Sequence, residues 1–301
     1  MRISIATLLS VVALMLSANV SYSDTPSPGK QVAQSVELPA STDIQLRPTA
    51  EQQAAEKARR EALTPKQRAA EDKERRERSL EAMLNPKPLS ETETQEIGYW
   101  LFLPKDYDAQ TEKTWPLLLF LHGMDERGND IEKVKMHGPP KLLNDPEKAK
   151  EWPFITVSPQ CPDYTTWSPI QLWLLLDKLE KQYAVDKDRI YVTGLSMGGF
   201  GTWGLLHQFP ERFAAGAPVC GGFNPAAAKQ FVDIPLWVFH GEKDPVIRVA
   251  MSIDMVEAIK NAGGNHTQLT LYPDLQHNSW SVTYDNPELF RWLLKQKRGK
   301  K

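Results

Sequence analysis

The segment at 190–201, IYVTGLSMGGFG, limits the possible folds of this chain more than any other. It joins an apolar run to a glycine-rich stretch through the pattern Gly-x-Ser-x-Gly at 194–198. The outer positions of so tight a turn are glycine because side chains there would collide with their neighbours. The strained turn would hold the hydroxyl of Ser196 above the end of a strand, at the positive N-terminus of a helix. We therefore predict a strand–turn–helix unit with a nucleophilic serine, and an ordinary glycine-rich turn is the alternative.

From residue 97 onward, short apolar runs alternate with amphipathic stretches of helical length. This alternation is typical of a mainly parallel sheet covered by helices. Capping pairs mark the starts of two helices, at Ser168-Pro169 and Asn286-Pro287. Strands are expected at the apolar runs 99–103, 117–121, 154–157, 190–193, 217–220, 236–239 and 268–272.

A serine hydroxyl is a poor nucleophile unless a general base takes its proton. Where the serine lies on a turn of this kind, the three residues follow one another along the chain in the order serine, acid, base. His277 lies five residues past the last expected strand, in a loop before the last helix, and is the predicted base. The other histidines are interpreted as structural or precede the expected position. They are His122 and His240, each in a His-Gly pair that would brace a turn, and His137, His207 and His266.

The acid is expected in the loop after the strand at 236–239. Asp244 ends that loop and is predicted to hold the His277 tautomer and stabilise the imidazolium. Glu242 lies nearer the strand and is expected in solvent. Asp274 would have to turn back on its own loop to reach the base.

Two backbone donors are expected to stabilise the oxyanion that forms when an acyl carbonyl is attacked. One is the N–H of Met197, which follows the serine. The other is the N–H of Met124, because Gly123 lets the loop after the strand at 117–121 turn inward. Donors of this kind are typically worth about 3–4 kcal/mol each in acyl-transfer enzymes.

Five sequence blocks occur in a consistent order along the chain: FLHGMDERGND at 120–130, HGPPKLL at 137–143, VSPQCP at 157–162, GLSMGGFGTW at 194–203 and HGEKD at 240–244. Together they resemble α/β-hydrolase esterases of the carboxylesterase and feruloyl-esterase type, including carbohydrate esterase family 1 and relatives labelled phospholipases or peptidases. The resemblance implies an α/β-hydrolase fold over about 97–295, with a mostly parallel central sheet flanked by helices. It also implies that Gln160 and Trp167 help to line the acyl or alcohol pocket, a core position being the alternative for Trp167.

The chain before this region has three parts with different compositions. Residues 1–23 combine an early arginine, an apolar run and small residues, which predicts a cleaved signal peptide rather than a membrane anchor. Residues 24–49 are rich in Pro, Ser and Thr and are predicted to be a disordered linker. Residues 50–95 are predicted to be a charged helical spacer, broken at Pro65, before a catalytic domain over 96–301. A docking element for the cell envelope or a partner is the alternative for 50–84.

Composition excludes several classes of protein. A net charge of −2 argues against a nucleic-acid partner, because phosphate binding needs a surplus of Lys and Arg. No internal apolar run reaches about 18 residues, the length at which a segment becomes a candidate membrane span. The only cysteines, Cys161 and Cys220, lack zinc-site spacing, and whether they form a disulfide stays open. No H-E-x-x-H motif or paired metal-ligand spacing occurs, so no cofactor and no metal is expected.

Only fifteen residues separate the strand at 217–220 from the strand at 236–239, which leaves no room for a helical cap domain. We therefore expect an open cleft suited to soluble or polymer-attached esters. The predicted function is an exported serine esterase, periplasmic or extracellular, acting on small acyl or hydroxycinnamoyl esters, free or linked to polysaccharide, without stable membrane insertion. A serine peptidase and a non-catalytic envelope protein with this fold are the alternatives.

Overall fold

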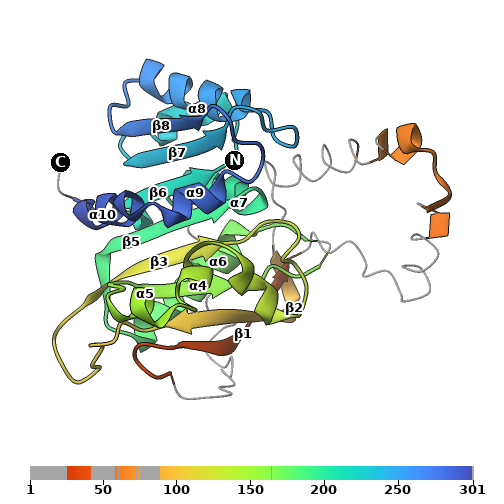
Figure 1. Cartoon of the computed structure of the whole chain (residues 1–301). Helices are drawn as coiled ribbons and strands as arrows, with labels where there is room; N and C mark the ends of the chain where they lie inside the picture. The colour runs from red at the N-terminus through yellow and green to blue at the C-terminus, as the bar shows by residue number, and fades with distance from the viewer. Residues whose placement is uncertain are drawn as a thin grey trace.

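The computed structural model describes residues 26–41, 58–59, 61–68, 70–71, 74, 89–163 and 165–299. Most of these residues belong to one sheet with helices on both faces (Figure 1). The strands, in the spatial order β1-β2-β4-β3-β5-β6-β7-β8, are β1 (Gln31–Ser41), β2 (Leu89–Phe102), β3 (Trp115–Leu121), β4 (Ile155–Pro159), β5 (Val185–Leu195), β6 (Ala215–Val219), β7 (Leu236–Gly241) and β8 (Thr267–Tyr272). β1 and β2 run antiparallel to their neighbours, and the pairs from β4 through β8 are parallel.

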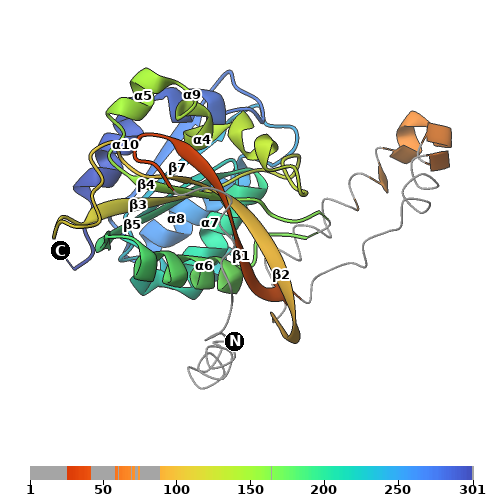
Figure 2. The same cartoon turned by 90° about the horizontal axis from the view of Figure 1, so that it is seen from below.

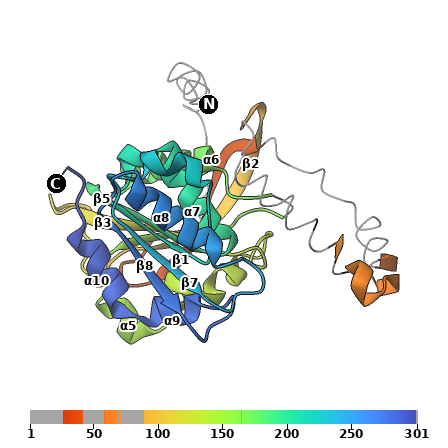
Figure 3. The same cartoon turned by 90° about the horizontal axis from the view of Figure 1, so that it is seen from above.

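The helices form two layers, which Figures 2 and 3 show on opposite sides of the sheet. The first layer contains α6 (Pro169–Gln182), α7 (Met197–Gln208) and α8 (Ala250–Asn261). The second contains α4 (Gly138–Leu142), α5 (Pro146–Lys150), α9 (Trp280–Asp285) and α10 (Pro287–Lys295). Three 3₁₀ segments complete the described elements: η1 (Ile131–Met136), η2 (Pro210–Arg212) and η3 (Pro225–Gln230).

Strand β3 explains why both faces are covered. Its side chains alternate between the two faces of the sheet, and every residue of the strand is buried. Leu117, Leu119 and Leu121 join the core beneath α6, α7 and α8, whereas Leu118 and Phe120 join the core beneath α4, α5, α9 and α10. A strand that is apolar on both sides requires helices on both sides, as in parallel α/β sheets generally.

The structure corrects the predicted linker over 24–49. Residues Gln31–Ser41 form β1, which pairs along its length with β2, and β2 begins at Leu89, so the predicted domain boundary at 96 falls inside a strand. Val36, Leu38 and Ala40 alternate with more exposed neighbours and fill the core from the edge of the sheet. Pro39 is tolerated because β1 is an edge strand.

The described residues cover only part of the N-terminal region for which predictions were made. The predicted signal peptide at 1–23 lies outside the described residues. Most described residues between 58 and 74 are helical, and the predicted break before Pro65 is present, since the Thr64 hydroxyl accepts a hydrogen bond from the Gln67 N–H at 3.3 Å. Within the described ranges, no helix has both the length and the apolar character needed to cross a membrane.

The connection between β6 and β7 contains only η3 and short loops, in agreement with the predicted lack of a cap. Ser196, at the carboxyl end of β5, is half-buried, and the His277 side chain is 19% exposed. Both side chains can therefore be reached from solvent at this edge of the sheet.

Candidate active site

Ser196 sits on a strained turn between β5 and α7. Its φ of 53° and ψ of −115° are unusual for a residue with a side chain. The turn is fixed because the Ser196 N–H donates to the Val219 carbonyl at 3.0 Å and the Ser196 carbonyl accepts from the Phe200 N–H at 3.1 Å. The predicted strand–turn–helix unit is therefore present, with the serine at the start of α7.

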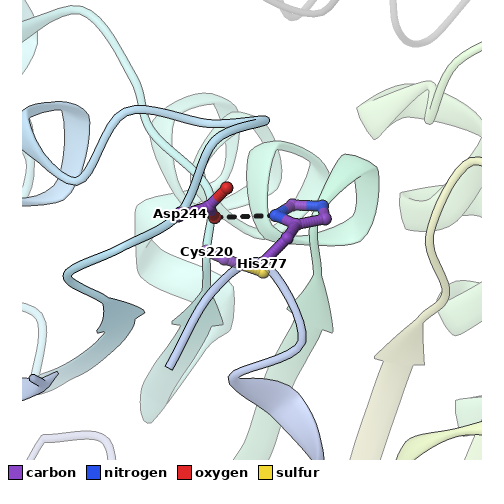
Figure 4. Close-up of side chains that lie close together, drawn as sticks. All are labelled: Cys220, Asp244 and His277. Carbon is purple, nitrogen blue, oxygen red and sulfur yellow. Dashed lines mark hydrogen bonds and ion pairs between the residues drawn. The ribbon is translucent and has the colours of Figure 1, made fainter. Parts of the chain in front are cut away.

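His277 lies between Ser196 and Asp244. Its Nδ1 is 2.7 Å from Asp244 Oδ2, and its Nε2 is 2.9 Å from Ser196 Oγ. Since an ionised carboxylate can only accept, Nδ1 carries the proton and Nε2 accepts from the serine hydroxyl. The three predicted residues are thus hydrogen-bonded in the order of a Ser-His-Asp triad, and Figure 4 shows the His277–Asp244 bond.

Asp244 is held as a carboxylate by several donors. Its Oδ1 accepts from the N–H groups of Val246 and Ile247 at 2.8 and 2.9 Å. Its Oδ2 lies 3.2 Å from Nε2 of His240, a ring that is fully buried. Burial alone would raise the pKa of Asp244, but the hydrogen bonds from His240, His277 and Ile247 outweigh burial and hold the pKa well below its usual value.

His240 therefore helps to hold the Asp244 carboxylate, a role that its His-Gly pair does not indicate in the sequence. Its Nδ1 is 2.7 Å from Ser252 Oγ, which donates in turn to the Gly221 carbonyl at 3.0 Å. Its Nε2 faces two acceptors, Asp244 Oδ2 and the Ile247 carbonyl. The ring thus ties the acid to α8, beyond the turn-bracing role that the His-Gly pair suggested.

The rejected candidates lie elsewhere. Glu242 is exposed, and Asp274 pairs at the surface with Lys243 at 2.7 Å. His266 is exposed, and His207 packs in α7 against Phe223. Among the described residues, none of these four groups is hydrogen-bonded to Ser196, His277 or Asp244.

The loop after β3 lies against the nucleophile. A Cβ placed on Gly123 would be 3.7 Å from Ser196 Cβ, so the Gly123-Met124 segment borders the serine. Arg127 fixes this loop, because its Nε donates to the Met124 carbonyl at 3.0 Å and its Nη1 to the Thr165 carbonyl at 2.9 Å. Met197 is the first residue of α7, where N–H groups have no partner within the helix.

Gln160 and Trp167 brace the same loop. The Gln160 amide donates to the carbonyls of Glu126 and Asp130 at 2.9 and 2.8 Å. The Trp167 indole donates to the His122 carbonyl at 3.1 Å. Both also line a pocket of about 300 Å³ beside α6, so their predicted contact with substrate remains a prediction alongside this structural role.

Cys220, Asp244 and His277 form a group of potential metal ligands within the described residues, with the ligand atoms within 4.8 Å of one another (Figure 4). Two of the three are already hydrogen-bonded to each other. Burial raises the pKa of the Cys220 thiol, so the thiolate that a metal requires is disfavoured. The arrangement therefore suits a proton relay better than a metal site. Cys161 and Cys220 are both free and buried, which answers the question of a disulfide.

His122 makes stability depend on pH. Burial lowers its pKa from 6.5 to about 3. Below pH 6.5 the unfolded chain binds a proton that the folded ring refuses, so stability should fall by roughly 1.4 kcal/mol per pH unit down to about pH 3. We expect His122→Gln to flatten the decline in unfolding free energy between pH 6.5 and 4.5, measured by urea denaturation. His266→Gln, at an exposed position, should keep the wild-type slope. Parallel curves for wild type and His122→Gln would contradict this assignment.

Three residues near the triad, Glu126, His137 and Trp280, have contacts that the sequence does not indicate. The Glu126 side chain is almost fully buried, with Oε1 3.6 Å from His137 Nε2. The Trp280 ring lies between two imidazoles, with centroids 5.5 Å from His137 and 5.1 Å from His277. The pattern HNSW at 277–280 was the only available signal, and it does not reveal a contact with His137 from another segment.

The chain is similar in sequence to several known hydrolases. Residues 170–285 match the family model of the dienelactone hydrolase family. The chain is 34% identical over 140 residues to the bifunctional acetylxylan esterase/xylanase XynS20E of Neocallimastix patriciarum, a match that covers 44% of this chain and 20% of that protein. It is 24% identical over 260 residues to dipeptidyl-peptidase 5 of Porphyromonas gingivalis, covering 65% of this chain and 36% of that protein. The chain thus spans between a fifth and about a third of these relatives' lengths.

Solved structures show the same fold. A thermostable esterase superposes with a TM-score of 0.59 at 35% identity, covering 68% of this chain and 60% of that one. A ferulic acid esterase superposes with a TM-score of 0.52 at 20% identity, covering 66% of this chain and 91% of that one. The predicted α/β-hydrolase fold is confirmed.

Proposed function

We propose that this α/β hydrolase is a serine esterase that releases small acyl or hydroxycinnamoyl groups from esters, including esters on polysaccharide. The observation that carries the proposal is the hydrogen-bonded chain Ser196–His277–Asp244 on a strained turn reached from solvent. Esterases among the similar proteins support the ester as the cleaved bond. The signal-peptide pattern of residues 1–23 supports an exported enzyme.

The proposed reaction starts at Ser196. Its Oγ attacks the ester carbonyl while His277 Nε2, 2.9 Å away, takes the hydroxyl proton. Asp244 stabilises the resulting imidazolium without becoming protonated. His277 then returns the proton to the leaving alcohol, which leaves an acyl-enzyme. A water molecule, deprotonated by the same imidazole, attacks this ester. The imidazolium then returns the proton to Ser196 Oγ as the acyl C–O bond breaks, which frees the acid and restores the serine hydroxyl.

Charge that develops on the carbonyl oxygen needs fixed donors. We assign this role to the N–H groups of Met197 and Met124. Met197 begins α7, whose N-terminus favours negative charge, and Met124 follows Gly123 beside Ser196. Gln160 and Trp167 support the proposed site by holding the loop that carries Met124.

A peptidase is the second candidate, because a dipeptidyl-peptidase is among the relatives and the same triad can cleave amides. A non-catalytic envelope protein is less well supported, since all three members of the triad are present and aligned. A contact of the charged segment 50–84 with the envelope or a partner remains compatible with the enzyme.

A series of substrates tests the proposal. We expect the kcat/KM of p-nitrophenyl esters to be highest at acetate and to fall toward laurate, or methyl ferulate to be the best ester, because no cap domain encloses a long acyl chain. Dipeptidyl p-nitroanilides, assayed in parallel, should react far more slowly. Faster cleavage of the anilides would favour the peptidase. Activity that rises steeply beyond octanoate, or that needs a lipid interface, would contradict the short-acyl assignment.

A further inference from the structure

A polar groove lies between α4 and α9, next to the triad. The space in it, which is open to solvent, is about 230 Å³, and its polar and aromatic lining comes from His137, Lys141, Trp280, Ser281, Tyr284 and Asp285. Figure 2 shows the two helices on the same face of the sheet. No step of the proposed reaction uses these residues.

The groove adjoins His277 through the ring of Trp280. The Trp280 ring stands at 90° to the His277 imidazole, with ring centroids 5.1 Å apart. The leaving oxygen of an ester must lie within hydrogen-bond reach of His277 Nε2, which protonates it. An alcohol that extends from that oxygen past the imidazole therefore meets Trp280 and the groove behind it.

The groove carries charged groups of both signs. Burial, with Lys141 nearby, lowers the pKa of His137, so this ring is neutral near pH 7. Behind His137, burial raises the pKa of Glu126, whose Oε1 lies 3.6 Å from the ring. Lys141 and Asp285 add one positive and one negative charge to the lining, and Lys148 of α5 lies 3.9 Å from Asp285. A groove with charges of both signs and several hydrogen-bonding groups fits a polyol better than an alkyl chain.

Trp280 also has an unused donor. Its indole Nε1 is buried and has no hydrogen-bond partner within the described part of the chain. Buried donors are nearly always paired, and a small rotation of the ring would bring this one within reach of a ligand hydroxyl in the groove. An aromatic face with a free N–H offers both contact for C–H groups and a hydrogen bond for a hydroxyl.

Two exposed apolar side chains are adjacent in sequence to residues of the groove. The described residues include three large exposed hydrophobic residues, and two of them, Met136 at 55% and Val282 at 49%, are chain neighbours of the lining residues His137 and Ser281. Exposed apolar side chains of this kind can contact a bound polymer.

We propose that the groove between α4 and α9 binds a sugar ring of the alcohol half of saccharide esters. The pyranose lies against Trp280, and His137, Ser281, Lys141 and Asp285 bind its hydroxyl groups. This inference rests on the proposed esterase function for its place in the reaction, but binding of the sugar itself can be measured without catalysis.

The first test is calorimetric titration of the full chain with xylotriose, which carries no ester. We expect a Kd in the millimolar range for wild type, which corresponds to about −4 kcal/mol. Trp280→Ala should weaken binding at least about tenfold, and Lys141→Ala and Asp285→Ala about threefold to tenfold. Lys260→Ala and Asp254→Ala, matched exposed positions on α8, should bind as wild type does. Absence of binding by wild type, or an unchanged Kd in Trp280→Ala and Asp285→Ala, would overturn the proposal.

The second test compares substrates that share an acyl group. For each variant, kcat/KM is measured on acetylated xylo-oligosaccharide and on p-nitrophenyl acetate, and the ratio is taken. We expect this ratio to fall at least about tenfold in Trp280→Ala, mainly through KM, and to stay constant in the α8 controls. Equal losses on both substrates would show that Trp280 acts only through His277, and a selective loss on methyl ferulate would make the groove an acyl site. Either outcome overturns the sugar assignment. Xylotriose binding without any ester hydrolysis would instead uphold the groove and reject the esterase.

Discussion

Ser196→Ala is expected to lower kcat on p-nitrophenyl acetate by about 10⁶-fold, the loss seen when a well-studied serine hydrolase loses its nucleophile. The reason lies in the covalent step. Ser196 Oγ is the atom aligned with His277 Nε2, at 2.9 Å, and alanine has no atom to form the acyl-enzyme. Stopped-flow release of p-nitrophenol measures the rate, and intact mass after rapid quenching detects the acetylated protein.

Two further variants separate this expectation from a general loss of structure. Ser27→Ala, at an exposed position before β1, should keep wild-type activity. The double variant Ser196→Ala/His277→Ala should be no slower than Ser196→Ala alone, because residues that act as one unit lose their effect together. Turnover by Ser196→Ala within tenfold of wild type, with unchanged thermal unfolding, would exclude Ser196 as the nucleophile.

Local sequence predicted most of the site because its parts follow one another in a fixed order along the chain. Gly-x-Ser-x-Gly after an apolar run located Ser196, and the last two loops before helices located Asp244 and His277. Each of these residues follows the carboxyl end of a strand, and parallel strands bring those ends to one edge of the sheet. Knowing the strands was therefore enough to infer that the three side chains converge.

Contacts between distant segments could not be inferred in the same way. Strand β1 is paired with β2, which begins far along the chain, and its Pro and Ser content favoured a linker although Val36, Leu38 and Ala40 alternate. In this 11-residue strand the alternation of buried residues, and not the composition, is the feature that indicates the structure. The neighbourhood of Glu126, His137 and Trp280 joins three loops whose packing depends on tertiary structure.

The sequence shows the spacing between His240 and Asp244 but not the contact between them. Its spacing of four residues from Asp244 is explicit in HGEKD, but a loop has no fixed geometry that would place an imidazole against a carboxylate. Only the fold shows that the ring is buried and reaches both Asp244 Oδ2 and Ser252 Oγ. A turn-bracing role and a role in holding the acid look alike in the sequence.

Gly198→Ala is expected to be the most destabilising single-methyl change at the site. A Cβ on Gly198 would lie 1.9 Å from the Leu121 carbonyl oxygen and 2.7 Å from that of His122. Both atoms are backbone at the end of the central strand β3, so no side-chain rotation can relieve the overlap. Overpacking a core costs typically about 1–3 kcal/mol even where side chains can yield. We expect a loss of about 3 kcal/mol or more in unfolding free energy, measured by urea denaturation.

Gly204→Ala provides the matched comparison on the same helix. A Cβ there would find only Pro169 Cγ at 3.7 Å, an ordinary contact. Alanine in place of glycine inside a helix stabilises by roughly 0.5–1 kcal/mol, so this variant should be as stable as wild type or more so. The two alanines thus add the same methyl group to α7 with opposite expected signs. If Gly198→Ala unfolds at the same urea concentration as Gly204→Ala, the close approach of α7 to β3 is wrong, and with it the position of Ser196 beside the Gly123-Met124 loop.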